Sequence, residues 1–275
     1  MNVHAFGCSH VYGHEHTQFL FDNPHAELNR ITGDTVALDQ NGVISNHAKM
    51  WNNYAKLWLP HLVSSVEDYA SASHTTSYAT VFSKLVGAEQ CYNYSERGSS
   101  NTQIYYTFLE QCDNIKDDDL VLIGVTGIMR QMQVYQDKCK SVMIGSNPHD
   151  TERYYELCED TYGNFLKVHA MTTAIKSMCN RVIFVNIDWA EYNNIAQFID
   201  TTNLHDRFDS ISNSAHAGTV NKLQEYFDDL FINKKLISEL ELEQPAKCFF
   251  NHYNIRSHNT FAEHIAAQYK GTQNV

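Results

Sequence analysis

The sequence contains few prolines and no proline- or glycine-rich stretch that could act as a linker. Only four prolines occur in 275 residues, and neither an internal repeat nor a low-complexity tract interrupts the chain. The length is sufficient for one large domain with a substantial hydrophobic core. We therefore expect a single domain over residues 1–275.

Long apolar runs and clusters of basic residues are also missing. No apolar stretch approaches the length of a bilayer-crossing helix, so the sequence predicts no membrane span. The chain has 32 acidic and 20 basic residues, a formal net charge of −12, and no Lys/Arg cluster. Phosphate binding needs a basic surface, so we expect no nucleic-acid partner. The first residues lack the basic and apolar regions of a secretory signal, and we expect none.

Regular cysteine spacing is absent as well. The seven cysteines are odd in number and form no CxxC pair, which favours reduced thiols and a cytoplasmic protein. Fifteen histidines, among them His14 and His16, leave a metal site open as an alternative to polar loop histidines. Because neither paired Cys/His ligands nor an HExxH motif occurs, we expect no metal.

Apolar strand patterns alternate with helical patterns along the chain. The run Leu-Val-Leu-Ile-Gly-Val at residues 120–125 is typical of a strand that is covered on both faces. We expect strands at residues 2–7, 88–94, 120–125, 181–187 and 248–250, and helices at residues 46–59, 75–86, 101–115, 151–179, 217–232 and 259–269. This alternation predicts an α/β fold with a parallel sheet and helices on both faces.

The turn after the first expected strand is the most informative segment. It reads Gly7-Cys8-Ser9-His10, with Gly13 shortly after it. A small-residue turn at this place carries its side chains to the carboxyl edge of a parallel sheet, where α/β proteins bind ligands. Ser9 is therefore a candidate nucleophile, and an ordinary turn serine is the alternative interpretation.

Two further loops are expected at the same edge. The loop 95–101 offers the backbone N–H groups around Gly98 and the amide of Asn101, and the loop 124–130 offers Thr126 and Arg130. Alternatively, Gly98 is only a turn glycine and Asn101 only the N-cap of the next helix. Arg130 contacts either substrate or a surface acid.

A histidine near the end of the chain could complete a catalytic pair. His258 is expected just before the helix 259–269, in a loop that can fold back to the sheet edge. There it would abstract the proton of the serine hydroxyl. The alternative is a histidine that caps backbone groups at the helix start.

Taken in order, these motifs resemble the SGNH (GDSL-type) hydrolases, most closely the divergent members encoded by bacteriophages. The resemblance implies a three-layer α/β/α sandwich with a flavodoxin-like sheet of about five strands, and an insertion at residues 14–72. It implies hydrolysis of an ester, often an acetylated carbohydrate or lipid, without a cofactor. The family's nucleophile matches Ser9, its second-block glycine matches Gly98, and its histidine matches His258.

The chain departs from the family pattern at three positions. Cys8 stands where the first block usually has an acid, and Thr126 where the third block usually has an asparagine. Ile255 stands where the family has the aspartate that orients the histidine. An esterase with a Ser-His dyad or a substitute acid is therefore our main expectation. A binding or virion-associated protein that has lost hydrolysis, and an acyltransferase on the same scaffold, are the alternatives.

Overall fold

The computed structural model of the chain describes residues 1–12, 77–96, 98–128, 130–135, 138–143, 161–197, 213–242, 253 and 255–273. The expected helix 46–59, the expected strand 248–250 and the expected insertion 14–72 lie outside the described residues.

A parallel sheet of four strands forms the centre of the described structure, in the order β2-β1-β3-β6. The strands are β1 (Val3–Phe6), β2 (Cys91–Asn93), β3 (Leu120–Val125) and β6 (Val182–Asn186). Each lies inside an expected strand, and the expected α/β class with a parallel sheet is confirmed. The register pairs Phe6 with Ile123 and Val125 with Asn186, so β1, β3 and β6 end at the same edge.

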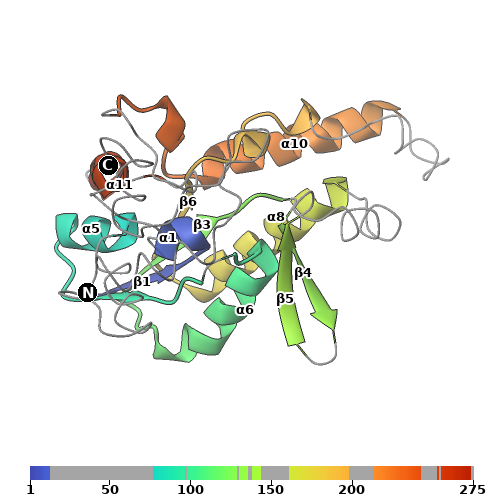
Figure 1. Cartoon of the computed structure of the whole chain (residues 1–275). Coiled ribbons are helices and arrows are strands. Elements are labelled where there is room, and N and C mark those ends of the chain that lie inside the picture. Colours follow the sequence, from blue (N-terminus) through green and yellow to red (C-terminus); the bar gives the residue numbers. More distant parts are fainter. Residues whose placement is uncertain are drawn as a thin grey trace, which may run out of the picture.

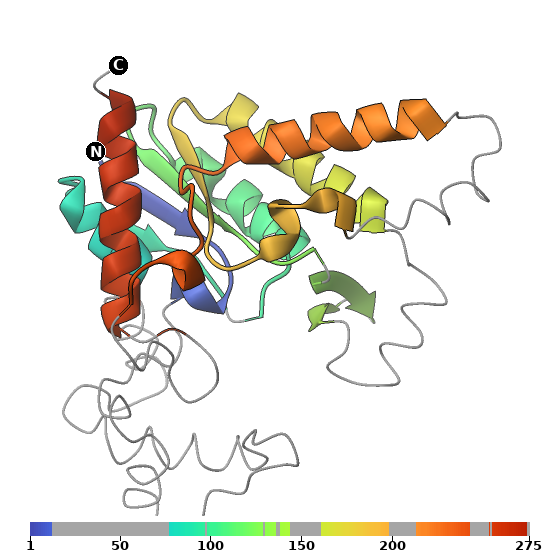
Figure 2. The same cartoon turned by 90° about the horizontal axis from the view of Figure 1, so that it is seen from above.

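Helices lie on both sides of this sheet (Figures 1 and 2). The helices are α1 (Ser9–Tyr12), α5 (Tyr78–Leu85), α6 (Asn101–Gln111), α8 (Thr161–Met178), α10 (Asn213–Leu230) and α11 (Ile255–Gln273). Short 3-10 turns are η2 (Cys112–Asn114), η3 (Ala190–Tyr192), η4 (Ile195–Gln197) and η5 (Ile237–Glu239). In the described part of the chain, no helix combines the length and apolarity of a membrane span.

The side chains of β3 alternate between two hydrophobic clusters. Val121, Ile123 and Val125 pack with α6, α8 and α10, whereas Leu120 and Leu122 pack with α5 and α11. Both sets are almost completely buried. This is why the strand reads as an unbroken apolar run, and burial of each such side chain contributes about 1.5–3 kcal/mol.

The helix ends show both agreement and difference. Gly87 has a φ of 76° and follows α5, as expected for a helix that stops at a glycine. In contrast, α11 begins at Ile255 instead of 259, so the expectation that His258 precedes the helix is wrong. Ser257 and His258 are 2% and 1% exposed and pack in the core. Their burial favours an additional first turn of α11, which the polar residues at this place in the sequence do not indicate.

An antiparallel hairpin of β4 (Arg130–Tyr135) and β5 (Lys138–Met143) was not expected from the sequence. It places Arg130 at the start of a strand, whereas we expected a loop that ended there. The signal was present, because Gln131 and Gln133 alternate with Met132 and Val134 as in a half-buried strand.

On the outer side of β6, the described residues form one isolated bridge and no further strand. Phe231 pairs in parallel with Phe184, and the N–H of Ile232 donates to the Phe184 carbonyl at 3.0 Å. Two residues further along β6, the side chain of Asn233 binds the backbone in place of a strand. Its Oδ1 accepts from the N–H of Asn186 and its Nδ2 donates to the Asn186 carbonyl.

Candidate active site at the carboxyl edge of the sheet

Ser9 is the first residue of α1 and follows β1 after only two residues. The helix can lie this close to the sheet because glycines stand beneath it. A Cβ atom built on Gly7 or on Gly124 would come within 2.2 Å of the Val11 side chain. The Gly7-Cys8-Ser9 turn thus places Ser9 at the carboxyl edge of the sheet, where the residue is 6% exposed.

The second loop lies against the first. The N–H of Glu96 donates to the Gly7 carbonyl at 3.2 Å, and the Asn93 amide donates to the Val11 carbonyl at 2.8 Å. Gly98 has a φ of 81°, a left-handed conformation that favours glycine, and it is exposed. The structure therefore brings the loops of Ser9 and Gly98 together at one edge.

Asn101 holds the backbone of the third loop. Its Oδ1 accepts from the N–H of Thr126 at 2.9 Å, while its Nδ2 donates to the Thr126 carbonyl at 2.7 Å and to the Tyr192 hydroxyl at 3.2 Å. Both amide hydrogens are thereby used, which leaves none for a substrate oxygen in this conformation. The alternative N-cap role is filled by Ser100, whose hydroxyl accepts from the N–H of Gln103.

Thr126 is fully buried directly after β3. Its carbonyl also accepts a hydrogen bond from the hydroxyl of Tyr192 at 2.8 Å. Its own hydroxyl has no hydrogen-bond partner among the described residues. A buried hydroxyl without a partner costs free energy, so a hydrogen bond to this group would be favourable.

Arg130 spans from the second loop to the end of β6. Its Nη1 lies 3.5 Å from the Ser99 carbonyl, and its Cζ lies 5.8 Å from the centre of the Trp189 ring. No carboxylate in the described part of the chain pairs with it, so the alternative of a surface ion pair receives no support there.

His258 is buried where α11 packs against α5. Its Nδ1 accepts a hydrogen bond from the backbone N–H of Tyr78 at 3.2 Å, and the two rings lie 5.6 Å apart. In the neutral ring this bond assigns the proton to Nε2. A donor thus occupies the nitrogen that the aspartate of a catalytic triad would bind as an acceptor.

The segment that leads into α11 lies next to α1. The rings of His10 and Tyr253 are 6.3 Å apart. Tyr78 connects β3 with α11, because its hydroxyl lies against Gly124 while its N–H binds His258.

Several residues of this edge were missed in the sequence. Asp188 accepts a hydrogen bond from the Tyr253 hydroxyl at 2.7 Å and another from Ser238, and it raises the pKa of Tyr253 together with burial. Glu191 accepts from the N–H of Ile128, and burial raises the pKa of its carboxyl. A usable signal existed, since polar residues follow the apolar run 181–187 directly.

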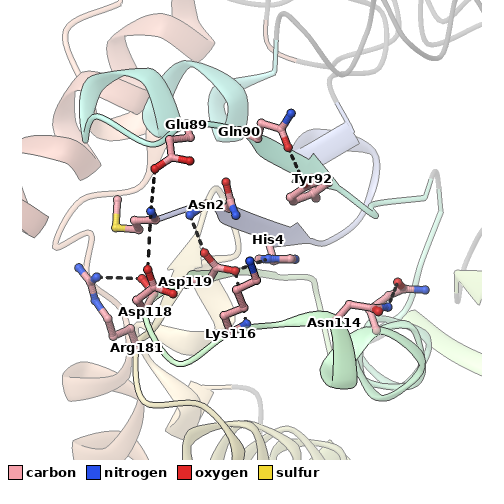
Figure 3. A network of polar contacts seen from close by, with 12 residues as sticks. Asn2, His4, Glu89, Gln90, Tyr92, Asn114, Lys116, Asp118, Asp119 and Arg181 are labelled. Carbon is pink, nitrogen blue, oxygen red and sulfur yellow. Dashed lines mark hydrogen bonds and ion pairs between the residues drawn. The ribbon is translucent and has the colours of Figure 1, made fainter.

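A second buried polar network lies at the opposite, amino end of the sheet (Figure 3). Asp119 accepts from the N–H groups of Asn2 and Lys116, at 2.6 and 3.3 Å, and its Oδ2 lies 3.2 Å from Nε2 of His4. Burial raises the pKa of Asp119, but these hydrogen bonds outweigh it and the pKa is lowered. This network connects β1 to the start of β3 and takes no part in the candidate site.

Metal-ligand clusters of three or more His, Cys, Asp or Glu side chains do not occur among the described residues. His14 and His16 lie outside them.

The sequence matches no protein-family model and no curated protein. The resemblance to SGNH hydrolases therefore depends on the order of the motifs and on their positions in the fold.

Proposed function

We propose that the protein is a serine ester hydrolase with Ser9 as nucleophile and His258 as base. The observation that carries the proposal is the position of Ser9. It begins a helix straight after the first strand of a parallel sheet, with the loop of Gly98 beside it and the segment that leads into α11 next to His10. This edge is where open α/β sheets act on their ligands.

In the proposed reaction, the Ser9 hydroxyl attacks the acyl carbonyl while His258 takes its proton. The tetrahedral oxyanion is held by the backbone N–H groups of Ser9 and Gly98, with the Thr126 hydroxyl as a third donor. The histidine then gives the proton to the leaving alcohol, and water releases the acyl group by the same route. Asn101 supports this site by fixing Thr126.

The resting ring of His258 must change before it can act. With Nδ1 bound to the Tyr78 N–H, the proton is on Nε2, which then has no lone pair for the proton of Ser9. The proposal therefore requires the proton to move to Nδ1 and the contact with Tyr78 to open when substrate binds.

The strand order supports the finer description of the fold that we propose. If only the parallel strands are numbered along the chain, so that β6 becomes the fourth, their order in the sheet is 2-1-3-4. The bridge at Phe231 marks the place beside β6 where we propose the fifth strand. We propose a flavodoxin-like sheet in a three-layer α/β/α sandwich, in a cytoplasmic protein that needs no cofactor. The free thiols of Cys8, Cys91, Cys112 and Cys179 are in keeping with a reducing compartment.

One observation favours a second candidate, a binding protein that has lost hydrolysis. The Tyr78 N–H occupies the nitrogen that an acid would orient, and Ile255 stands at the position of that acid. Such a protein would keep the ligand-binding edge without an activated serine.

Labelling with a fluorophosphonate probe separates the two candidates. We expect the folded full chain to be labelled and Ser9→Ala not to be labelled. Ser99→Ala, which removes a serine of the neighbouring loop, should react like the natural sequence. His258→Gln should slow the reaction by about 10²–10⁴-fold, the usual contribution of a general base. A folded chain that the probe does not modify would rule out the hydrolase and favour the binding protein.

A further inference from the structure

Arg130 carries a positive charge that forms no ion pair among the described residues. Its guanidinium carries this positive charge and five N–H donors. It makes one long contact with the Ser99 carbonyl, at 3.5 Å, and lies over the Trp189 ring. Neither a carboxylate nor a second carbonyl among the described residues uses the remaining donors. This is notable in a chain with a net charge of −12.

Trp189, beneath the guanidinium, is held rigidly. The side chain of Asn186 accepts from its N–H and donates to its carbonyl, both at 2.9 Å. The indole covers Gly127, where a built Cβ would come within 2.8 Å of the ring. Its own Nε1–H is buried and has no hydrogen-bond partner in the described part of the chain.

The hydroxyl of Thr126 is a third unsatisfied group, next to Gly127 in the chain. It is completely buried, and no described residue hydrogen-bonds to it. The segment after β3 is therefore close to several hydrogen-bond donors that lack acceptors among the described residues, and Arg130 is the one that carries a charge. A group with negative charge and oxygen acceptors is the partner that a guanidinium binds most strongly.

This cluster lies beside the proposed nucleophile. The Trp189 ring contacts His10, the neighbour of Ser9, with ring centres 6.3 Å apart. Arg130 reaches Ser99, the neighbour of Gly98. The cluster is therefore continuous with the two loops that hold Ser9 and the proposed oxyanion donors.

We propose that Arg130, which lies over the Trp189 ring, binds an anionic oxygen group of the substrate, a carboxylate or a phosphate, next to the ester. The inference rests on the proposed function for the identity of the reaction, and it narrows the substrate class to acidic esters such as acylated acidic carbohydrates. Arg130 pairs with two oxygens of the anion through the N–H groups along one edge of its planar guanidinium, while its face lies over Trp189. Glu191 borders the same turn, but its carboxylate binds the N–H of Ile128 and forms no ion pair with Arg130.

The test is calorimetric titration of the full-length Ser9→Ala variant, which removes turnover from the measurement. The probes are glucuronate, glucose 6-phosphate and, as the neutral match, glucose. We expect at least one anionic probe to bind at least about tenfold more tightly than glucose, and binding to weaken as salt is added. The comparison of glucuronate with glucose 6-phosphate tells a carboxylate from a phosphate.

Matched variants complete the test. Arg130→Gln should weaken binding of the anionic probe by at least about tenfold, whereas Arg130→Lys, which keeps the charge but loses the planar fork, should weaken it less. Lys84→Gln removes one positive charge from an exposed position on α5 and should leave binding unchanged.

Equal binding of glucose and the anions overturns the inference, and so does a lack of binding by every anionic probe. Unchanged binding by Arg130→Gln, or equal weakening by Lys84→Gln, overturns it as well. Because this binding needs no active serine, it stands or falls separately from fluorophosphonate labelling.

Discussion

The backbone N–H of Tyr78 donates a hydrogen bond to Nδ1 of His258, a residue 180 positions further along the chain. The contact fixes α11 against the start of α5 and sets which nitrogen of the imidazole carries the proton. Tyr78 thereby joins both halves of the candidate site, because its hydroxyl lies against Gly124 beneath α1. The same residue supplies the first of three predictions.

Tyr78→Phe should leave the free energy of unfolding unchanged or raise it by about 1 kcal/mol. The hydroxyl of Tyr78 is fully buried and has no partner among the described residues, so its removal relieves a desolvation cost. Burial also holds the pKa of this phenol well above its usual range.

Tyr192→Phe is the matched control, because this hydroxyl donates to the Thr126 carbonyl and accepts from Asn101. Its loss should cost about 0.5–1.5 kcal/mol. Urea denaturation of both variants measures the difference. Equal losses in the two would mean that Tyr78 has a hydrogen-bond partner.

Asp119→Asn should destabilise the fold in a pH-dependent way. The pKa of Asp119 is lower in the fold than in the unfolded chain, so its carboxylate stabilises the protein at pH values above its ordinary pKa. This stabilisation is lost as the pH falls through the lowered value. We expect the variant to lose about 1.5–3 kcal/mol at neutral pH, as for hydrogen bonds to a charged group.

The difference between Asp119→Asn and the natural sequence should shrink in acid, which denaturation curves at neutral and acidic pH would measure. Asp118→Asn is the control, because its carboxylate is 73% exposed and lies 3.8 Å from the N-terminal amine. It should change stability little at either pH. A constant penalty for Asp119→Asn across the pH range would contradict the prediction.

Gly124→Ala should cost about 1–3 kcal/mol because of overpacking beneath α1. The new methyl group would meet Cγ2 of Val11 at 2.2 Å and the Tyr78 hydroxyl at 2.9 Å. Val11→Ala removes the worst contact, so the double variant should recover part of the loss in a double-mutant cycle.

Gly7→Ala is the comparison for this cycle. Its methyl group would also meet Cγ2 of Val11 at 2.2 Å, but it would meet Cβ of Val11 at 2.7 Å and the Gly124 carbonyl at 3.2 Å as well, and these two atoms remain in Val11→Ala. We therefore expect less rescue than at Gly124. Equal rescue at both glycines would show that α1 adjusts as a whole.

The central strands could be predicted because a strand that is buried on both faces has an unbroken run of apolar residues. The run 120–125 became β3 without change, and the expectation for 181–187 contains β6. The start of α11 could not be predicted, since it depends on burial of Ser257 and His258 against a helix far away in the chain. Polar residues at a helix start look the same in sequence whether they face solvent or the core.

Parts of the candidate site were predictable for a similar local reason. Ser9, Gly98 and Thr126 all follow strands of the parallel sheet, and the carboxyl ends of parallel strands share an edge. The partners of these residues were not predictable. The hydrogen bonds of Asn101 with Thr126 and of Tyr253 with Asp188 join residues that are 25 and 65 positions apart in the chain. Contacts over such separations leave no local pattern in the sequence.

The side chain of Asn233 has a consequence beyond the fold itself. At the end of β6 and just beyond it, the carbonyls of Phe184, Asn186 and Ile187 and the N–H of Asn186 are bound by Ile232, Asn233 and Ile237. These backbone groups are therefore not open to a strand from another molecule. This part of the outer side of β6 is thus protected against edge-to-edge self-assembly, which is a hazard for any open sheet at high protein concentration.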